Sequence, residues 1–240
     1  YYALVNSSFT YTIATTPFCQ KDISAGFGMP LNRVLLTPQP KTAQIAFPLP
    51  VENETLNKQE LTHVLYAPTW RPYEAVELFP FADFEFTEFA EFLSENNIHI
   101  WLRVHPRFEQ EIDSKLLASS NIHLFSAKEY SEVNAYLAYF NALITDYSSI
   151  YYDYLTLERP VLFFDYDFEK YKERVGVIDD YKKVKSTATT LNAEQFNKQL
   201  LDIKNSNFDM AKIKAVNSLV NYPVANNEIE KIVLGKLKLL

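Results

Sequence analysis

Three short motifs carry side chains that suit the chemistry of a phosphate group. The segment VLYAPTWRP contains Thr69 and Arg71, and IWLRVHPRF contains His105 just before a proline. The third segment, ALITDYSSIYYDYL, contains the pair Ser148 and Ser149. A guanidinium group donates a fork of hydrogen bonds to phosphate oxygens, and an imidazole donates a proton or a charge-assisted hydrogen bond. Two serines at a helix start add hydroxyls and backbone N–H groups, so together the motifs predict a diphosphate site.

Each motif also has an ordinary structural interpretation. A loop arginine, a half-buried tryptophan and a serine at a helix N-cap are all common without a ligand. Asp146 is expected to fix its turn or orient a partner, because a carboxylate repels phosphate. A Ser-His-Asp hydrolase built from Ser148, His105 and Asp146 is disfavoured because the sequence has no G-x-S-x-G segment. The remaining histidines are expected to be structural: His63, His99 and His123.

Glycine is scarce, which excludes the common glycine-rich phosphate loops. The 240 residues include 4 glycines, against 16 tyrosines and 18 phenylalanines, and contain neither GxxxxGK[ST] nor GxGxxG. A phosphate group would therefore be held by side chains and a helix N-terminus. No spacing of His, Cys, Asp and Glu resembles a metal site, and no cofactor is expected.

Composition and charge narrow the class of protein. Hydrophobic residues make up 48% and charged residues 22%, an ordinary balance for a globular chain. The net charge of -7 disfavours nucleic acid as a partner. A single cysteine, Cys19, fits a reducing compartment, and no apolar run is long enough to span a membrane. No signal peptide is visible, and because the sequence lacks a first methionine, a fragment or processed form is expected.

Apolar runs rich in β-branched and aromatic residues alternate with segments of helical periodicity. Strands are predicted at Ala3–Val5, Val34–Leu36, His63–Ala67, Ile98–Val104, Ile122–Phe125, Ala142–Thr145 and Val161–Phe164. The alternation predicts an α/β fold with a mostly parallel sheet covered by helices on both faces. Such sheets bind ligands just beyond the C-terminal ends of their strands, which is where all three motifs lie.

Helices are predicted from apolar residues spaced three and four apart. One helix contains Phe86 and Leu93, and a second contains Val133 and Phe140. Ser126, three residues before Glu129, forms a capping-box pattern that would start the second helix. Further helices are expected to begin at Asn192 and to include Ile229 to Leu240, and the proline-rich stretch Thr37–Pro50 is expected to be a linker.

Taken in order, YAPTWR, HPR, ITDYSSIYYDYLTLERPVLFF and DYDFEKY resemble the CDP-glycerol glycerophosphotransferase family, which includes teichoic acid polymerases and capsule polymerases. The resemblance covers residues 2–176 and is strongest from Asn141 to Tyr171. It implies a GT-B fold with two Rossmann-like halves. Residues 1–45 would be the end of the acceptor half with the linker, and residues 46–240 the Rossmann-like domain that binds the CDP-linked donor.

The resemblance also implies roles for individual residues. His105 would be catalytic and would contact the donor, and Ser148 and Ser149 would hold its diphosphate. Thr69 and Arg71 correspond to the family's APTWR loop. The other expected donor contacts are Arg107, Asp146 and Glu169.

The activity implied is transfer of glycerol phosphate, or ribitol phosphate, from CDP-glycerol or CDP-ribitol to a hydroxyl of a teichoic-acid-like or capsule polymer, with release of CMP. The enzyme would be cytoplasmic and peripheral at the inner face of the cell membrane. The family's other catalytic histidine, in a Trp-His-Gly segment, is absent here, and the Gly-x-Pro-Arg-Asn-Asp segment becomes Pro38–Ala43. The family's Pro-Gly turn is also missing near Asp179–Lys185. Two alternatives stay open: a GT-B glycosyltransferase that uses a nucleotide sugar, and a donor-binding fragment that is inactive alone.

Overall fold

A computed structural model describes residues 9–178, 180–222 and 228–236 of the chain. Five parallel strands form one sheet in the order β5-β4-β3-β6-β7. Their bounds are β3 Thr62–Tyr66, β4 Ile98–Leu102, β5 Ile122–Leu124, β6 Ala142–Thr145 and β7 Val161–Phe163. A parallel sheet is covered on both faces, which explains why a run such as ALIT in β6 is buried throughout.

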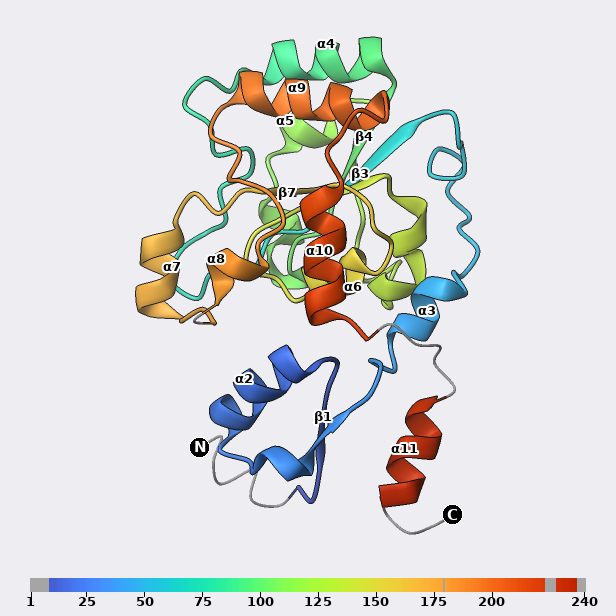
Figure 1. Ribbon diagram of the computed structural model, residues 1–240. Coiled ribbons are helices and arrows are strands. Elements are labelled where there is room, and N and C mark those ends of the chain that lie inside the picture. Colours follow the sequence, from blue (N-terminus) through green and yellow to red (C-terminus); the bar gives the residue numbers. More distant parts are fainter. Residues whose placement is uncertain (1–8, 179, 223–227, 237–240) are drawn as a thin grey trace.

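Alternate strand residues enter two separate hydrophobic cores. Val64 and Ile100 pack on one face with helices α4 (Phe86–Asn96) and α9 (Ala193–Lys204). Leu65 and Trp101 pack on the other face with η3 (Val133–Tyr139), α6 (Ile150–Leu155) and α10 (Ala211–Val220). Figure 1 shows α4 and α9 together at one end of the molecule, away from α6 and α10. The predicted α/β fold with a parallel, two-sided sheet is confirmed.

A second, smaller unit precedes this domain. It contains a two-stranded parallel sheet of β1 (Thr12–Ala14) and β2 (Val34–Leu36), joined by α2 (Pro17–Phe27) and η1 (Leu31–Arg33). Thr16 caps α2 by accepting a hydrogen bond from the Cys19 amide at 3.3 Å. Its hydroxyl also donates to the Leu219 carbonyl at 2.8 Å, and Thr15 donates to the Val220 carbonyl. The unit is therefore attached to the end of α10, below the large domain in Figure 1.

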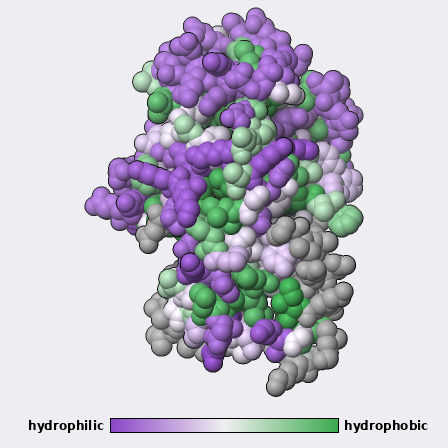
Figure 2. All heavy atoms as spheres, viewed as in Figure 1, coloured by the Kyte–Doolittle hydropathy of each residue, from purple (hydrophilic) through white to green (hydrophobic). Residues whose placement is uncertain are grey.

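The remaining elements are short and lie mainly in loops. They are α3 Thr42–Ala46, η2 Pro106–Glu111, α5 Ser114–Leu117, α7 Phe168–Arg174, α8 Tyr181–Val184 and α11 Glu228–Lys236. None of the described helices has the length and apolarity that crossing a bilayer requires. In the view of Figure 2, hydrophobic residues gather near the junction of the two units, whereas the surface above is mostly hydrophilic.

Six of the predicted strands are present, with ends that differ by at most two residues. The predicted strand at Ala3–Val5 lies outside the described residues, and β1 was not predicted. Helix α9 begins as expected, because the Asn192 side chain accepts from the Gln195 amide at 2.8 Å. The linker contains a helix, α3, that the prolines did not indicate. The division into domains at residue 45 stays a prediction.

The capping box predicted at Ser126 is wrong. Residues 127–129 form a turn, and the next helix is a 3-10 helix that begins at Val133. Glu109 supplies the carboxylate instead of Glu129, and it accepts from the Ala127 amide at 2.8 Å and from the Ser126 hydroxyl at 3.2 Å. A long-range partner therefore satisfies the turn, and the local capping pattern is not used.

Candidate functional site

The order of strands creates a switch point between β3 and β6. From β3 the chain moves outward to β4 and β5, and it then returns to the other side of β3 to form β6 and β7. Ligands of open α/β sheets bind at such a point, beyond the C-terminal ends of the strands. The loops that follow β3 and β6 meet there, since the Thr69 amide donates to Asp146 Oδ1 at 2.8 Å.

Arg71 is buried beneath the loops that follow β3 and β6. Its side chain is fully buried, and it donates from Nη1 to Asp146 Oδ2 at 2.6 Å and from Nη2 to Asp167 Oδ1 at 2.8 Å. Nε donates to Asp167 Oδ2 at 3.0 Å, and Nη1 also contacts the Thr69 carbonyl. In this arrangement the guanidinium is committed to carboxylates, and the expected direct contact of Arg71 with the donor stays a prediction. It joins the loops after β3, β6 and β7.

Tyrosines surround the same arginine. The Tyr147 hydroxyl donates to Asp167 Oδ1 at 3.0 Å, and its ring stacks on Tyr171 with centroids 3.9 Å apart. The Arg71 guanidinium lies 5.0 Å from the Tyr147 ring centroid and 5.2 Å from that of Tyr171. A second hydroxyl, that of Tyr73, donates to Asp167 at 3.2 Å. The acidic segment after β7 therefore packs directly under the serine loop.

Burial and the charge of Arg71 shift the pKa values of Asp146 and Asp167 in opposite directions. Burial raises the pKa of Asp146, although the positive charge of Arg71 opposes the rise. Burial also pushes the pKa of Asp167 upward, but the hydrogen bonds and charge of Arg71 outweigh it, and the pKa lies below its ordinary value. Burial raises the pKa of the Tyr147 hydroxyl, so this tyrosine is neutral and donates. The cluster therefore depends on the positive charge of Arg71.

Ser148 and Ser149 line a hollow of about 190 Å³ at the switch point. Inside the first turn, the amides of Tyr151 and Tyr152 donate to the carbonyls of Ser148 and Ser149 at 3.2 and 3.1 Å. The Ile150 amide points to Ser148 Oγ at 3.4 Å. In the described part of the chain, the amides of Ser148 and Ser149 donate to no protein acceptor. In this loop, the donors that remain for an anion are therefore the backbone amides and the side-chain hydroxyls of Ser148 and Ser149.

The sequence did not single out the opposite wall of this hollow. Lys185 lines it and forms an ion pair with Asp165, with Nζ 2.6 Å from Oδ2, and it also donates to the Thr189 hydroxyl at 2.6 Å. Tyr181 donates to the same carboxylate at 3.0 Å. Burial lowers the pKa of Lys185, although Asp165 opposes the change. The only signal in the sequence was the acidic segment DYDFEKY, which begins at Asp165.

The serine hollow continues into the space between the two units. Four residues, Ser149, Tyr152, Ile178 and Val184, also line a second hollow of about 240 Å³. Its far wall includes Phe18, Cys19 and Asp22 from α2, and Lys41 from the linker. Lys41 is itself paired with the buried Asp153 of α6, with Nζ 2.6 Å from Oδ2. The site is therefore a cleft between the small unit and the large domain.

His105 is exposed at the end of β4 and lies outside this cleft. Its Nδ1 accepts from the Arg107 amide at 3.3 Å, and its ring centroid lies 5.9 Å from that of Trp70 and 6.0 Å from that of Phe108. The three rings line a separate small hollow. His105 and the serines do not follow adjacent strands, because β3 lies between β4 and β6. Strands β4 and β6 are therefore two strand spacings apart, about 10 Å.

The other predicted donor contacts lie at the periphery. Arg107 is exposed next to His105, and Glu169 is exposed in the first turn of α7. Thr69 is half-buried, and its amide is used by Asp146. The structure thus brings together Thr69, Arg71, Asp146 and the serine pair, and it leaves His105, Arg107 and Glu169 on surrounding loops.

Comparisons with known proteins find relatives that take part in teichoic acid synthesis. The chain is 29% identical over 187 residues to a teichoic acid glycerol-phosphate primase of Bacillus subtilis, which covers 75% of the chain and 46% of that protein. It is 28% identical over 184 residues to a teichoic acid poly(ribitol-phosphate) polymerase of Bacillus spizizenii, covering 72% of the chain and 29% of that protein. The chain thus spans less than half the length of these relatives.

The fold is also found in a solved structure. The wall teichoic acid polymerase TagF superposes with a TM-score of 0.73 at 24% identity, over 99% of this chain and 60% of that one. Residues 1–234 match the family described as CDP-Glycerol:Poly(glycerophosphate) glycerophosphotransferase. The match extends across both units and the cleft between them. The chain belongs to the CDP-glycerol:poly(glycerophosphate) glycerophosphotransferase family.

Proposed function

We propose that this chain is the donor-binding part of an enzyme that transfers polyol phosphate from a CDP-linked donor to a hydroxyl of a growing teichoic-acid-like or capsule polymer. The observation that carries the proposal is the serine-lined hollow at the switch point, in a chain that matches the family over residues 1–234. A solved structure of the TagF polymerase, in a histidine variant, was obtained with CDPG. Relatives that handle glycerol phosphate and ribitol phosphate both support a polyol phosphate as the transferred group.

In this proposal the oxygen of the acceptor hydroxyl attacks the phosphorus next to the polyol, and the bond to the bridging oxygen of CMP breaks. The leaving CMP gains negative charge on its phosphate. The amides and hydroxyls of Ser148 and Ser149 would stabilise that charge, because they face the hollow and have donors to spare. The proton of the acceptor hydroxyl would pass to a base contributed by the acceptor half.

His105 would contact the donor from the opposite side of β3. The spacing of about 10 Å between β4 and β6 exceeds one diphosphate but is within the reach of a whole nucleotide-linked donor. We therefore assign His105 to a phosphate or polyol contact at the rim, and we assign Arg71 to positioning of the serine loop. Arg107 and Glu169 would contact only those parts of the donor that extend beyond the cleft.

Isothermal titration of the chain with CDP-glycerol, CDP-ribitol, CMP and a UDP-sugar tests the proposal. We expect a CDP-polyol to bind and the Ser148→Ala/Ser149→Ala variant to bind it at least about tenfold more weakly, as for loss of hydrogen bonds to a charged group. Ser94→Ala is a matched control, since Ser94 is exposed on α4. Stronger binding of the UDP-sugar would contradict the proposal and favour a glycosyltransferase.

A cytoplasmic location with peripheral contact at the inner face of the membrane completes the proposal. The absence of a spanning helix among the described residues is compatible with such contact. Flotation of the enzyme with anionic lipid vesicles would test it, and failure to float at low salt would argue against it.

A further inference from the structure

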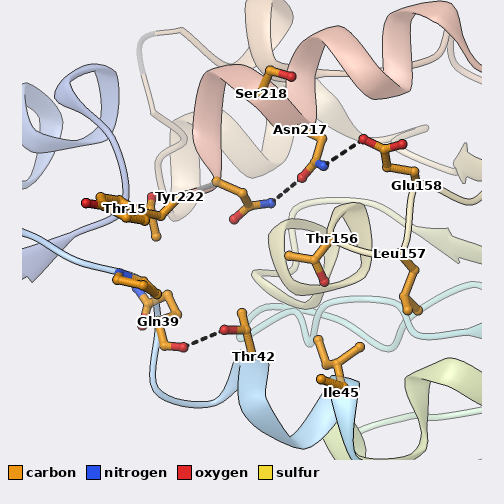
Figure 3. Close-up of a pocket in the computed structure, with 13 residues that line it drawn as sticks. Thr15, Gln39, Thr42, Ile45, Thr156, Leu157, Glu158, Asn217, Ser218 and Tyr222 are labelled. Atoms are coloured by element: carbon orange, nitrogen blue, oxygen red, sulfur yellow. Dashed lines mark hydrogen bonds between the residues drawn. The ribbon is translucent and has the colours of Figure 1, made fainter. Parts of the chain in front are cut away.

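A large hollow next to the cleft has no role in the proposed transfer. It shares Thr15, Gln39 and Asn221 with the second hollow of the cleft, and none of its lining residues lines the serine hollow. It measures about 500 Å³ and lies where the linker, the end of α6 and the end of α10 meet. Figure 3 shows Thr15 and Gln39 on one side and Asn217 and Glu158 on another. A concave space of this size is typical of sites for small molecules. It contacts the small unit through Thr15 and the large domain through α10.

The lining is rich in neutral hydrogen-bonding groups. Thr156, Asn217, Ser218, Asn221 and Gln39 contribute hydroxyls and amides, and Ile45 and Leu157 contribute apolar surface. Among the described residues, no lysine or arginine lines the hollow, and one carboxylate, that of Glu158, does. A phosphate-bearing ligand would meet this carboxylate with no compensating cation. The lining therefore disfavours nucleotides and phosphate, and it suits a ligand with several hydroxyl groups.

The polar groups are connected to one another and held in place. The Asn221 amide donates to the Tyr152 carbonyl at 2.8 Å and to Asn217 Oδ1 at 2.9 Å. The Asn217 amide in turn donates to Glu158 Oε1 at 3.2 Å, as Figure 3 shows. This series of hydrogen bonds fixes the orientation of both side-chain amides. Each acceptor still has lone pairs for a ligand, because a carboxylate has about four acceptor positions.

Glu158 also has an unusual backbone. Its φ is 48°, in the left-handed region where glycine or asparagine is the ordinary choice, and its amide donates to the Leu155 carbonyl at the end of α6. A glutamate at such a position adopts a backbone conformation that it disfavours. Strained residues of this kind cluster at binding sites, which makes the carboxylate a candidate ligand contact.

We infer that this hollow, defined by Glu158, Asn217, Asn221, Thr156 and Gln39, binds a neutral polyhydroxylated molecule, a free polyol or a sugar. The oxygens of Glu158, Asn217 and Asn221 accept from its hydroxyls, and the second side-chain N–H of Asn217 donates to them. The Tyr222 ring offers an apolar face. Because the hollow contacts both units, a bound molecule favours the arrangement in which the small unit and the large domain are in contact. This inference does not depend on the proposed transfer reaction.

The test is an NMR titration of the full chain with glycerol, ribitol and N-acetylglucosamine, with spermidine and inorganic phosphate as contrasting probes. We expect at least one neutral probe to shift the amide signals of Thr156 and Asn217. Glu158→Gly and Asn217→Ala should each weaken its binding at least about tenfold, whereas Asn207→Ala, beyond the end of α9, should leave it unchanged. Glu158→Gly should melt at or above the wild-type temperature, because glycine accepts the left-handed backbone.

Three results would overturn the inference: no neutral probe binds, binding is the same in Glu158→Gly, or spermidine or phosphate shifts these signals in place of the neutral probes. Titration of the same variants with CDP-glycerol separates this site from the serine cleft. Unchanged donor binding with lost polyol binding supports the inference, and loss of both in variants that melt normally would contradict an independent site.

Discussion

Replacement of Arg71 by alanine should destabilise the protein strongly, because the arginine is the buried countercharge of two carboxylates. The side chain of Arg71 is 0% exposed, and those of Asp146 and Asp167 are 2% and 6% exposed. Removing one partner of a buried ion pair costs about 3 to 5 kcal/mol, since the other charge remains desolvated. For a chain of this size the melting temperature should fall by about 6 to 20 °C.

The pH dependence of this loss has a defined sign. In the wild type, burial already raises the pKa of Asp146, and Arg71 limits the rise. Without Arg71 the pKa of Asp146 rises further, so the carboxyl is protonated and its burial penalty relieved as the pH falls. The stability deficit of Arg71→Ala should therefore be largest near neutral pH and should shrink toward about pH 5. Arg71→Lys should be intermediate, because an ammonium cannot bridge two carboxylates with a planar fork.

Thermal and urea unfolding between pH 5 and 8 measures both effects. Arg174→Ala is the matched control, because Arg174 is exposed at the end of α7 and should change stability by less than about 0.5 kcal/mol. If Arg71→Ala unfolded like Arg174→Ala at neutral pH, the view of Arg71 as a buried countercharge would be refuted. A deficit that grew at acidic pH would refute the assigned role of Asp146.

Three further predictions concern other groups. His105→Ala, assayed together with the acceptor half, should lower turnover by about 10²-fold, and wild-type turnover would remove His105 from the site. Lys185→Met should lower the melting temperature by leaving Asp165 unpaired, and Lys185→Met/Asp165→Leu should recover much of the loss; equal melting of both variants would contradict the pairing. Burial lowers the pKa of His99 and of His123 to about 4. The stability of the wild type should therefore fall as the pH drops from about 6.5 through 4. Replacing both histidines with glutamine should flatten that dependence in thermal melts.

The strands and the position of the serine loop could be predicted because both depend on local sequence. A run such as ALIT places mostly apolar residues on both faces of its strand, as expected for a parallel sheet covered on both sides. The polar residues that follow the run must then lie at the C-terminal end of the strand. Helix α9 was predictable for the same reason, since its cap is formed within three residues by Asn192 and Gln195.

The partners of the site residues could not be predicted in this way. Arg71 and Asp167 are 96 residues apart in the chain, and Ser126 takes its carboxylate from Glu109 across 17 residues. An arginine after a strand has the same local sequence whether it faces a ligand or a buried acid. Strand order decides the outcome, and it also placed β3 between His105 and the serines.

In the proposed function, the pairing of charges around the serine hollow would let a chain with so few glycines hold a diphosphate. Asp146, directly before the loop, would repel an anion if Arg71 did not neutralise it, and Asp165 would do the same without Lys185. When both ion pairs are formed, a diphosphate in the hollow would meet no unpaired carboxylate among the described lining residues. The attractive groups are then the N–H and O–H dipoles of Ser148 and Ser149, which act strongly because they are fixed in place. In the proposed function, Arg71 would favour an anion by neutralising the carboxylate of Asp146 beneath the site, without contacting the ligand itself.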